Sequence, residues 1–301
     1  MSLSAFRVTQ GVMVHQSTAN LQRNLQRMQD LQNQLSSGRS LNKPSDSPSG
    51  TVAALQYRSD IRRSAQYARN ADDGLGWLGM ADNALTSSLD LVRRVRDLVV
   101  QAGNASLDQS GRNAISLEVI QIKQSLLSVA NTTFLDRPIF AGTASTATAY
   151  DSAGVFLGNN SRVSRNVAPG QQVDVNLDGQ ATFGDSSAGL LKTLDDIAGH
   201  LNSGTPADIA TLITTDLNTL DTNRLNLQNQ LASVGARYKR VEDMKGRAAD
   251  SQITLKGGLS EVEDIDLPKT ITDLQLQQVA YQAAISATAK VIQPSLVDFL
   301  R

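Results

Sequence analysis

The most constraining feature of this chain is a repeat of three and four residues near each of its ends. In residues 8–37 the repeat runs through Val14, Thr18, Leu21, Leu25, Met28, Gln32 and Leu35. In residues 267–292 it runs through Leu267, Ile271, Leu274, Gln278, Tyr281, Ile285, Thr288 and Ile292. This spacing is typical of the line along which two helices pack in a coiled coil. We therefore expect a long helix at each end and pairing between the two.

Two more helices are predicted in the first half of the chain. Helical periodicity begins at Pro48, which follows the N-cap candidate Ser47, and continues toward Ala102. The pair Gly103-Asn104 interrupts it. A further helix, with one apolar face, is predicted from about residue 107 to 130.

The texture changes in residues 144–184 and then becomes helical again. Charge is sparse there, and in residues 173–177 apolar and polar residues alternate, which predicts short strands joined by turns. From Thr205-Pro206 a long helix is predicted to run to Gly257-Gly258. The order of elements predicts a chain that runs out along a rod of helices and returns.

The composition excludes several classes of protein. The 301 residues include no cysteine, so disulfides and thiol chemistry are excluded. The formal net charge of −1 gives no basic field that would attract nucleic acid. No run of about 18 apolar residues predicts a membrane-spanning helix. The first 20 residues do not follow the pattern of a cleaved signal peptide, so we expect any export to use another route.

Candidate chemical motifs are isolated. Residues 74–79, GLGWLG, have the spacing of a dinucleotide-binding turn, but no strand precedes them, and we interpret the glycines as close packing contacts. His15 and His200 each lack a second histidine or a paired carboxylate at ligand spacing. The basic run 93–96 is flanked by acidic residues and is interpreted as a solvated face with ion pairs. No catalytic residue, metal or cofactor is predicted.

The two ends carry opposite charge. Residues 1–44 hold five basic residues and one acidic residue, whereas residues 261–301 hold three basic and six acidic residues. Complementary charge favours pairing of the ends and predicts contacts of Arg23 and Arg27 with Asp266 and Asp273. The alternative is two unrelated amphipathic helices that dock on a common core. Because several positions in each repeat are polar, we expect the pair to be weak until further copies pack around it.

A family resemblance is strongest in residues 35–50, LSSGRSLNKPSDSPSG. This segment resembles the end of the N-terminal helix in bacterial flagellins and hook-associated proteins. Residues 70–75, NADDGL, and 94–101, RVRDLVVQ, resemble two further blocks of that family. The chain is therefore similar to the bacterial flagellin family over most of its length.

Other segments resemble the hook-associated branch that joins hook and filament more than they resemble filament flagellins. The most telling is FAGT at residues 140–143. The insert departs from the usual pattern at residues 158–160, GNN, where the family carries Gly-Asp. The segments that agree with this branch are FRVTQ at 6–10, NLDG at 176–179, YQAA at 281–284 and PSLVDFL at 294–300.

The resemblance implies a mainly α fold with a small β insert, built as a flagellin-like elongated rod of long antiparallel helices whose terminal helices pair as a coiled coil. It implies three domains. Residues 1–44 with 264–301 would form the terminal coiled coil, residues 45–143 with 185–263 the helical rod, and residues 144–184 a small outward β insert.

The implied function is that of a structural subunit of the flagellum, an adaptor between hook and filament that works by self-assembly. The implied partners are further copies of the chain, a neighbouring hook-associated protein and flagellin. Export through the flagellar type III pathway would place the protein outside the cell, after a cytoplasmic chaperone had covered the C-terminal helix. Enzyme activity, a cofactor, nucleic-acid binding and membrane insertion are not expected. The residues predicted to form the interface with subunits or chaperone are Val14, Leu21, Leu25, Met28, Leu35, Leu267, Ile271, Leu274, Tyr281, Ile285 and Ile292.

Two other functions fit the same residues. A short filament flagellin would polymerise alone into long filaments, whereas a junction protein would need the hook as a template. A secreted coiled-coil effector or adhesin would bind a host surface and would not localise to flagella.

Overall fold

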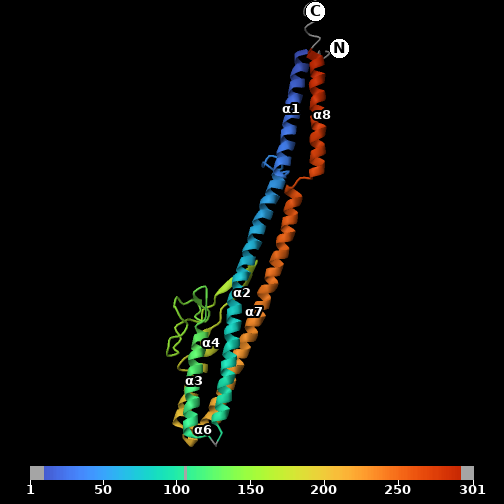
Figure 1. Cartoon of the computed structure of the whole chain (residues 1–301). Helices are drawn as coiled ribbons and strands as arrows, with labels where there is room; N and C mark the ends of the chain where they lie inside the picture. Colours follow the sequence, from blue (N-terminus) through green and yellow to red (C-terminus); the bar gives the residue numbers. More distant parts are fainter. Residues whose placement is uncertain (1–9, 105–106, 293–301) are drawn as a thin grey trace, which may run out of the picture. The chain divides into compact units, whose positions relative to one another are not determined.

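A computed structural model of the chain describes residues 10–104 and 107–292 (Figure 1). The mainly α fold with a small β insert is confirmed. The helices are α1 (Gln10–Ser37), α2 (Pro48–Ala102), α3 (Gln109–Ala130), α4 (Gly179–Phe183), α5 (Leu190–Ser203), α6 (Pro206–Thr211), α7 (Leu217–Glu263) and α8 (Leu267–Ile292), with a π-helical turn, η1 (Leu212–Asp216), between α6 and α7. The strands are β1 (Thr133–Phe134), β2 (Arg137–Pro138), β3 (Ser164–Ala168) and β4 (Gln171–Asp174).

The chain divides into two compact units. One unit consists of residues 1–62 and 252–301, and the other of residues 63–251. Helices α2 and α7 each contribute residues to both units. The domain boundaries expected from the family, at residues 44, 143, 184 and 263, remain a prediction.

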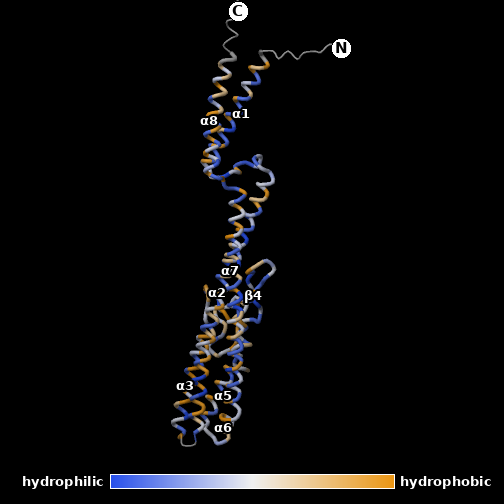
Figure 2. Tube along the Cα trace, turned by 90° about the vertical axis from the view of Figure 1, so that its right-hand side faces the viewer, coloured by the Kyte–Doolittle hydropathy of each residue, from blue (hydrophilic) through white to orange (hydrophobic). Residues whose placement is uncertain are grey.

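In the first unit, α1 and α8 lie side by side, as the two views in Figures 1 and 2 agree. Helix α1 ends where predicted, because Gly38 adopts the left-handed φ of +71° that stops a helix. Helix α2 also begins where predicted, since the Ser47 hydroxyl accepts a hydrogen bond from the Gly50 amide at 3.1 Å and Pro48 takes the first helical position.

In the second unit, α7 contributes an apolar residue to the core at every second turn. Leu220, Leu227, Val234 and Val241 are spaced by seven residues and are all fully buried. Helices α3 and α5 pack against each other, and the Ser116 hydroxyl donates to the Ala198 carbonyl at 2.8 Å between them. This unit holds most of the buried apolar side chains of the described chain.

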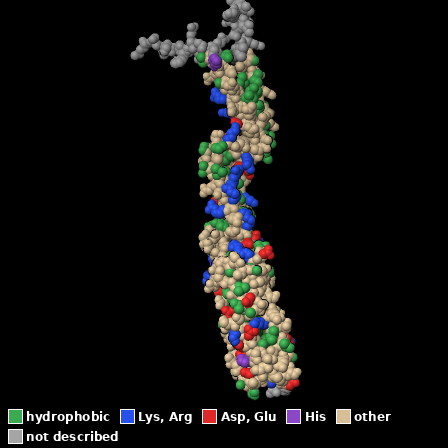
Figure 3. Space-filling view, turned by 90° about the vertical axis from the view of Figure 1, so that its left-hand side faces the viewer, with side chains coloured by type: hydrophobic (Ala, Val, Ile, Leu, Met, Phe, Trp, Pro, Cys, Tyr) green, Lys and Arg blue, Asp and Glu red, His purple; other side chains and the backbone are tan. Residues whose placement is uncertain are grey.

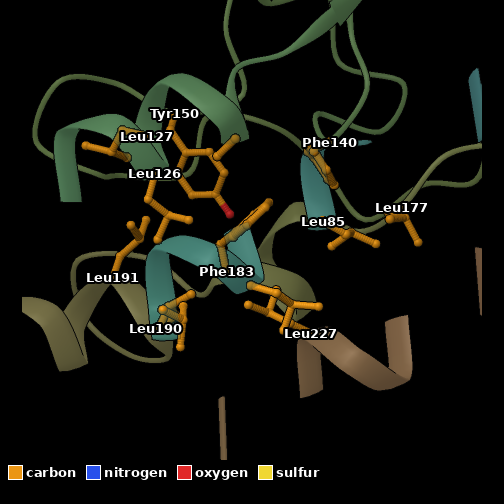
Figure 4. Packing of buried hydrophobic residues seen from close by; sticks show 14 of the residues in the cluster. Leu85, Leu126, Leu127, Phe140, Tyr150, Leu177, Phe183, Leu190, Leu191 and Leu227 are labelled. Atoms are coloured by element: carbon orange, nitrogen blue, oxygen red, sulfur yellow. The ribbon is translucent and has the colours of Figure 1, made fainter. Parts of the chain in front are cut away.

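The β insert shares this core. Strands β3 and β4 of the insert pair antiparallel around a turn at Pro169-Gly170, and β1 pairs with β2 in a shorter hairpin that precedes the insert. Tyr150 lies against Leu126 and Phe183 (Figure 4), with ring centroids of Tyr150 and Phe183 6.3 Å apart. The Phe140 ring meets the Phe183 ring edge to face at 4.9 Å. Tyr150 and Phe183 of the insert therefore pack against α3 and against Phe140, which precedes the insert.

The long helix predicted to begin at Thr205-Pro206 does not end at Gly257-Gly258, so that predicted end is wrong. Helix α7 passes through both glycines and ends at Glu263. Glycine costs a helix interior only about 1 kcal/mol relative to alanine, so packing can override it. A Cβ atom at Gly258 would come within 2.9 Å of the Tyr57 ring, so the glycine lets this ring pack closely against α7 and does not mark a helix end.

The same predicted helix also contains an interruption. Residues Leu212–Asp216 form the π-helical turn, and the carboxylate of Asp216, which is buried, lies 2.6 Å from Nδ1 of His200. A π-helical turn widens the helix locally and was not indicated by the apolar spacing, which runs through it without a break.

The Tyr150 hydroxyl gives the second unit a specific sensitivity to high pH. Burial, with a smaller contribution from the nearby carboxylates of Asp178 and Asp185, raises the pKa of Tyr150 well above its usual value near 10. The hydroxyl donates to the Gly184 carbonyl at 2.9 Å. In the unfolded chain the phenol ionises above about pH 10, whereas in the folded protein it stays protonated. Its contribution to stability is therefore complete below about pH 10 and is lost as the pH rises above that value.

We predict that Tyr150→Phe lowers the free energy of unfolding by about 1 kcal/mol at neutral pH, because the Gly184 carbonyl loses its donor. Urea unfolding measured between about pH 8 and about pH 11 should also decline less steeply in this variant than in the wild type. Tyr238→Phe, at an exposed tyrosine of the same unit, is the matched control. If the free energy of unfolding declined with pH equally in Tyr150→Phe and wild type, Tyr150 would not be the source of the sensitivity to high pH.

Candidate assembly surfaces

On α1, the residues that face α8 differ from the predicted set. At every second position the residue that faces α8 lies one place before the predicted one. Val14, Leu21, Met28 and Leu35 are partly buried, as expected. Between them the partly buried positions are Ser17, Asn24 and Leu31, whereas the predicted Thr18, Leu25 and Gln32 are exposed.

Helix α8 shows the same difference. Leu274, Tyr281 and Thr288 are shielded by the pair, as expected. The alternating positions are Thr270, Gln277 and Ala284, each one residue before the predicted Ile271, Gln278 and Ile285, which are exposed. Leu267 is also exposed, and the side chain of Ile292 lies outside the described residues, as do segments 6–9 and 294–300.

This rotation brings polar side chains into the interface. The Gln277 side-chain amide donates to the Asn24 carbonyl at 3.2 Å across the pair. Ser17, Thr270 and Ala284 are small, so they bury little apolar area. The interface therefore gains close approach and a hydrogen bond, while larger apolar side chains are turned outward.

The outward-turned residues form a second line on each helix, which we call the flanking line. It consists of the positions that follow the interface residues by one: Thr18, Leu25 and Gln32 on α1, and Ile271, Gln278 and Ile285 on α8. Positions seven residues apart lie on nearly the same face of a helix, so each set is continuous along its helix. Figure 3 shows apolar side chains at the surface of the unit that contains these helices.

Helix α8 exposes more apolar surface than its flanking line alone. Leu276 is 71% exposed and Val279 is 66% exposed, and both lie on another face of the helix. A helix that is apolar on several faces usually has more than one packing partner. Within the described residues, the close packing of this helix is with α1.

Two of the charged residues predicted to pair the two ends, Arg23 and Asp266, make other contacts in this structure. The Arg23 guanidinium donates to Oδ1 of Asn20 at 2.7 Å within α1, and Asp266 accepts from the Lys269 amide at 3.1 Å at the start of α8. Within residues 10–104 and 107–292, no ion pair joins Arg23 or Arg27 to Asp266 or Asp273. The pairing of these charges remains a prediction for an assembled state.

The motifs considered for chemistry have structural surroundings. Gly76 lies inside α2, where a Cβ atom would come within 2.5 Å of the Phe134 ring, so the glycine is a packing contact as interpreted. His15 is exposed on α1, and His200 contacts Asp216. In the described chain, no three acidic or histidine side chains are grouped so that they could hold a metal ion.

The basic run of α2 is paired, in agreement with the interpretation of a face with ion pairs. Arg93 contacts Asp90 within the helix, Arg94 contacts Glu118 of α3, and Arg96 contacts Asp221 of α7.

Across the residues that the structure describes, none of the helices is both long and apolar enough to span a membrane.

Two features of these surfaces were missed from the sequence. The interface line through Asn24 and Gln277 was overlooked because it contains fewer apolar residues than the line beside it. Its signal was the repeat of Leu31 with Asn24 and Ser17, which has the same seven-residue period. The second feature is the buried carboxylate of Glu263 at the end of α7, for which the sequence pattern gave no indication.

Comparison with known proteins places these helices in one family. Residues 8–145 match the model of the bacterial flagellin N-terminal helical region, and residues 217–300 match that of the C-terminal helical region. Together the two regions take in most of the chain, including α1 and α8.

Among curated relatives, flagellin of Bacillus subtilis (strain 168) is 26% identical, covering 86% of this chain and 87% of its own length. Flagellar hook-associated protein 3 of Escherichia coli (strain K12) is 23% identical, covering 84% of this chain and 87% of its own length. Sequence identity alone therefore does not separate the two branches.

Among solved structures, a flagellar hook-associated protein from Vibrio parahaemolyticus superposes with a TM-score of 0.67 at 21% identity, covering 73% of this chain and 100% of that one. The flagellar junction protein from Legionella pneumophila gives a TM-score of 0.58 at 14% identity, covering 70% of this chain and 100% of that one. At these identities the likeness establishes the fold.

We predict that the double substitution Ile271→Gln, Ile285→Gln changes the free energy of unfolding of the free protein by less than about 0.5 kcal/mol, because both side chains are exposed. Leu274→Gln, on the neighbouring face of α8 that packs against α1, should lower the free energy of unfolding by about 1 kcal/mol or more. Urea unfolding followed by circular dichroism compares the two. Equal destabilisation by both changes would show that the flanking line is already packed in the free chain.

Proposed function

Because the chain belongs to the bacterial flagellin family, we propose that it is a structural subunit of the flagellum that joins the hook to the filament. The observation that carries the junction role is the shared fold with hook-associated and junction proteins, which covers 73% and 70% of this chain in the two structures described above. The FAGT segment at residues 140–143, at the boundary of that insert, supports the same branch.

The terminal helices supply the surface for self-assembly in this proposal. In the free chain α1 and α8 cover only one face of each other, and the flanking line stays exposed. Packing of neighbouring copies against Leu25, Ile271 and Ile285 would remove these side chains from water, at about 25 cal/mol per Å² of apolar area. Residues 1–44 and 264–301 would then form the inner part of a ring of identical subunits, between a hook-associated neighbour and flagellin.

The remaining segments also have proposed places in the assembled ring. Residues 45–143 and 185–263 form a helical layer around the inner part, and residues 144–184 form an outer β insert. The ion pairs of Arg94 with Glu118 and of Arg96 with Asp221 hold helices of that layer together. The proposal assigns no reaction and no cofactor to the chain, since the family is a structural component of the flagellum.

Export follows from the place of assembly. A flagellar subunit beyond the hook works outside the cell, and we propose that this chain reaches it through the flagellar type III pathway. A cytoplasmic chaperone is proposed to cover α8 beforehand, because Leu276 and Val279 would otherwise be exposed apolar surface at high subunit concentration.

A filament flagellin is the competing function, and the Bacillus subtilis flagellin is 26% identical to this chain. The two functions differ in what nucleates assembly. A filament flagellin extends its own polymer, whereas a junction subunit stops after a short zone of contact with two different neighbours.

We predict that deletion of the gene leaves hooks intact, abolishes attached filaments and releases flagellin into the medium. Electron microscopy of the cells and immunoblotting of the medium measure these outcomes, and expression of the wild-type chain from a plasmid is the control. Hooks with attached filaments of normal length would contradict the junction role. Loss of filaments with no flagellin in the medium would instead identify the chain as the filament subunit.

A further inference from the structure

A short segment ties the end of α1 to the end of α7. We call it the joint and define it as residues 38–40 and 262–265 together with Arg58. The Ser40 amide donates to the Glu263 carbonyl at 2.7 Å, and the Ile265 amide donates to the Gly38 carbonyl at 3.2 Å. These bonds bracket an antiparallel bridge between residues 39 and 264. The chain that leaves α1 is therefore fixed to the chain that enters α8.

The carboxylate of Glu263 lies at the centre of the joint. Its side chain is only 5% exposed, and Oε1 lies 3.0 Å from Nε of Arg39. The Arg58 guanidinium of α2 bonds the same oxygen. A buried carboxylate is stable only when its charge is matched and its lone pairs are satisfied. Glu263 therefore needs both arginines, which come from the connector after α1 and from α2.

The interface of α1 with α8 does not fix its own register. Its alternating positions are Ser17, Asn24 and Leu31 on α1 and Thr270, Gln277 and Ala284 on α8; all but Leu31 are small or polar, and they repeat every seven residues. A shift of α1 by one heptad therefore still places positions of this set opposite one another. A single polar contact at the interface favours one register, and here that contact uses the Asn24 main-chain carbonyl, which every residue of the helix offers.

We propose that Glu263 is the positioning residue that sets the register of α1 against α8. The joint holds the last turn of α1 at a fixed point beside the first turn of α8, and the helices then pair from that point outward. The register determines which residues of α1 lie opposite which residues of α8. The joint therefore also determines which exposed side chains of the flanking line lie at the same height on the two helices. This consequence for assembly rests on the proposed function, whereas the register itself belongs to the free chain.

Pulsed electron resonance on the full chain tests the proposal. The sequence contains no cysteine, so nitroxide labels at Gln16→Cys and Gln275→Cys are the only ones. Both positions are exposed, and they lie eight residues before Asn24 and two residues before Gln277. The two labels are therefore about 15 Å apart along the pair, and a shift by one heptad changes this separation by about 10 Å.

Wild type should give one distance between the two labels. Glu263→Gln should add a second peak, shifted by the displacement of one heptad, about 10 Å along the pair. Loss of a charge-assisted bond predicts a rise of about tenfold or more in the shifted population. Arg39→Gln, which removes the partner that is 55% exposed, should give the same second peak in smaller amount. Glu261→Gln, two residues earlier on the exposed face of α7, is the matched control and should match wild type.

A single unshifted peak in Glu263→Gln and Arg39→Gln would overturn the proposal. A broad distribution without peaks, at unchanged helix content by circular dichroism, would also overturn it, because the joint would then be needed for pairing and not for register. If Glu263→Gln loses helix content, Arg39→Gln decides. None of these readings depends on assembly, so they stand or fall separately from the flagellar role.

Discussion

The contact between α1 and α8 is the constraint on which the rest of the account depends. On each helix small or polar residues alternate with larger apolar ones in the contact, and among the described residues one hydrogen bond, from Gln277 to Asn24, crosses the interface. Such an interface buries little apolar area, while ordering two helices of more than 25 residues each costs conformational entropy at every residue. The pair is therefore formed but not strongly stabilised, and its larger apolar side chains remain available to other chains.

The second unit follows the opposite rule. Its α7 residues Leu220, Leu227, Val234 and Val241 are fully buried, and Phe140, together with Tyr150 and Phe183 of the insert, belongs to the same core. Its polar side chains are joined in specific pairs such as Ser116 with Ala198 and Arg96 with Asp221. A self-sufficient unit and an incomplete one thus occur in a single chain, which is what a subunit needs if it must fold alone and yet add to a growing structure.

The sequence predicted the elements well where a local signal decided them. The start of α2 at Pro48 and the end of α1 before Gly38 follow from caps that act on a few neighbouring residues. The end of α7 was misplaced because Gly257 and Gly258 read locally as a stop, while the contact with Tyr57 is made by a residue about 200 positions away. The interface register was misplaced for a related reason: on α8 apolar spacing selects the line of Ile271 and Ile285, whereas the pair uses the neighbouring line through Gln277. The joint around Glu263 could not be predicted, since its partners Arg39 and Arg58 are brought to it only by the fold.

Backbone hydrogen exchange in the free, full-length chain measures the central claim most directly, because protection reports local stability helix by helix. We predict that amides of α1 and α8 exchange with much lower protection than amides of α2 and α7 around Leu85 and Leu227, and that α1 and α8 gain protection when the protein is part of an isolated flagellum. Protection in the free chain that is as high in α1 and α8 as in the second unit would contradict it, since the terminal pair would then be complete without partners.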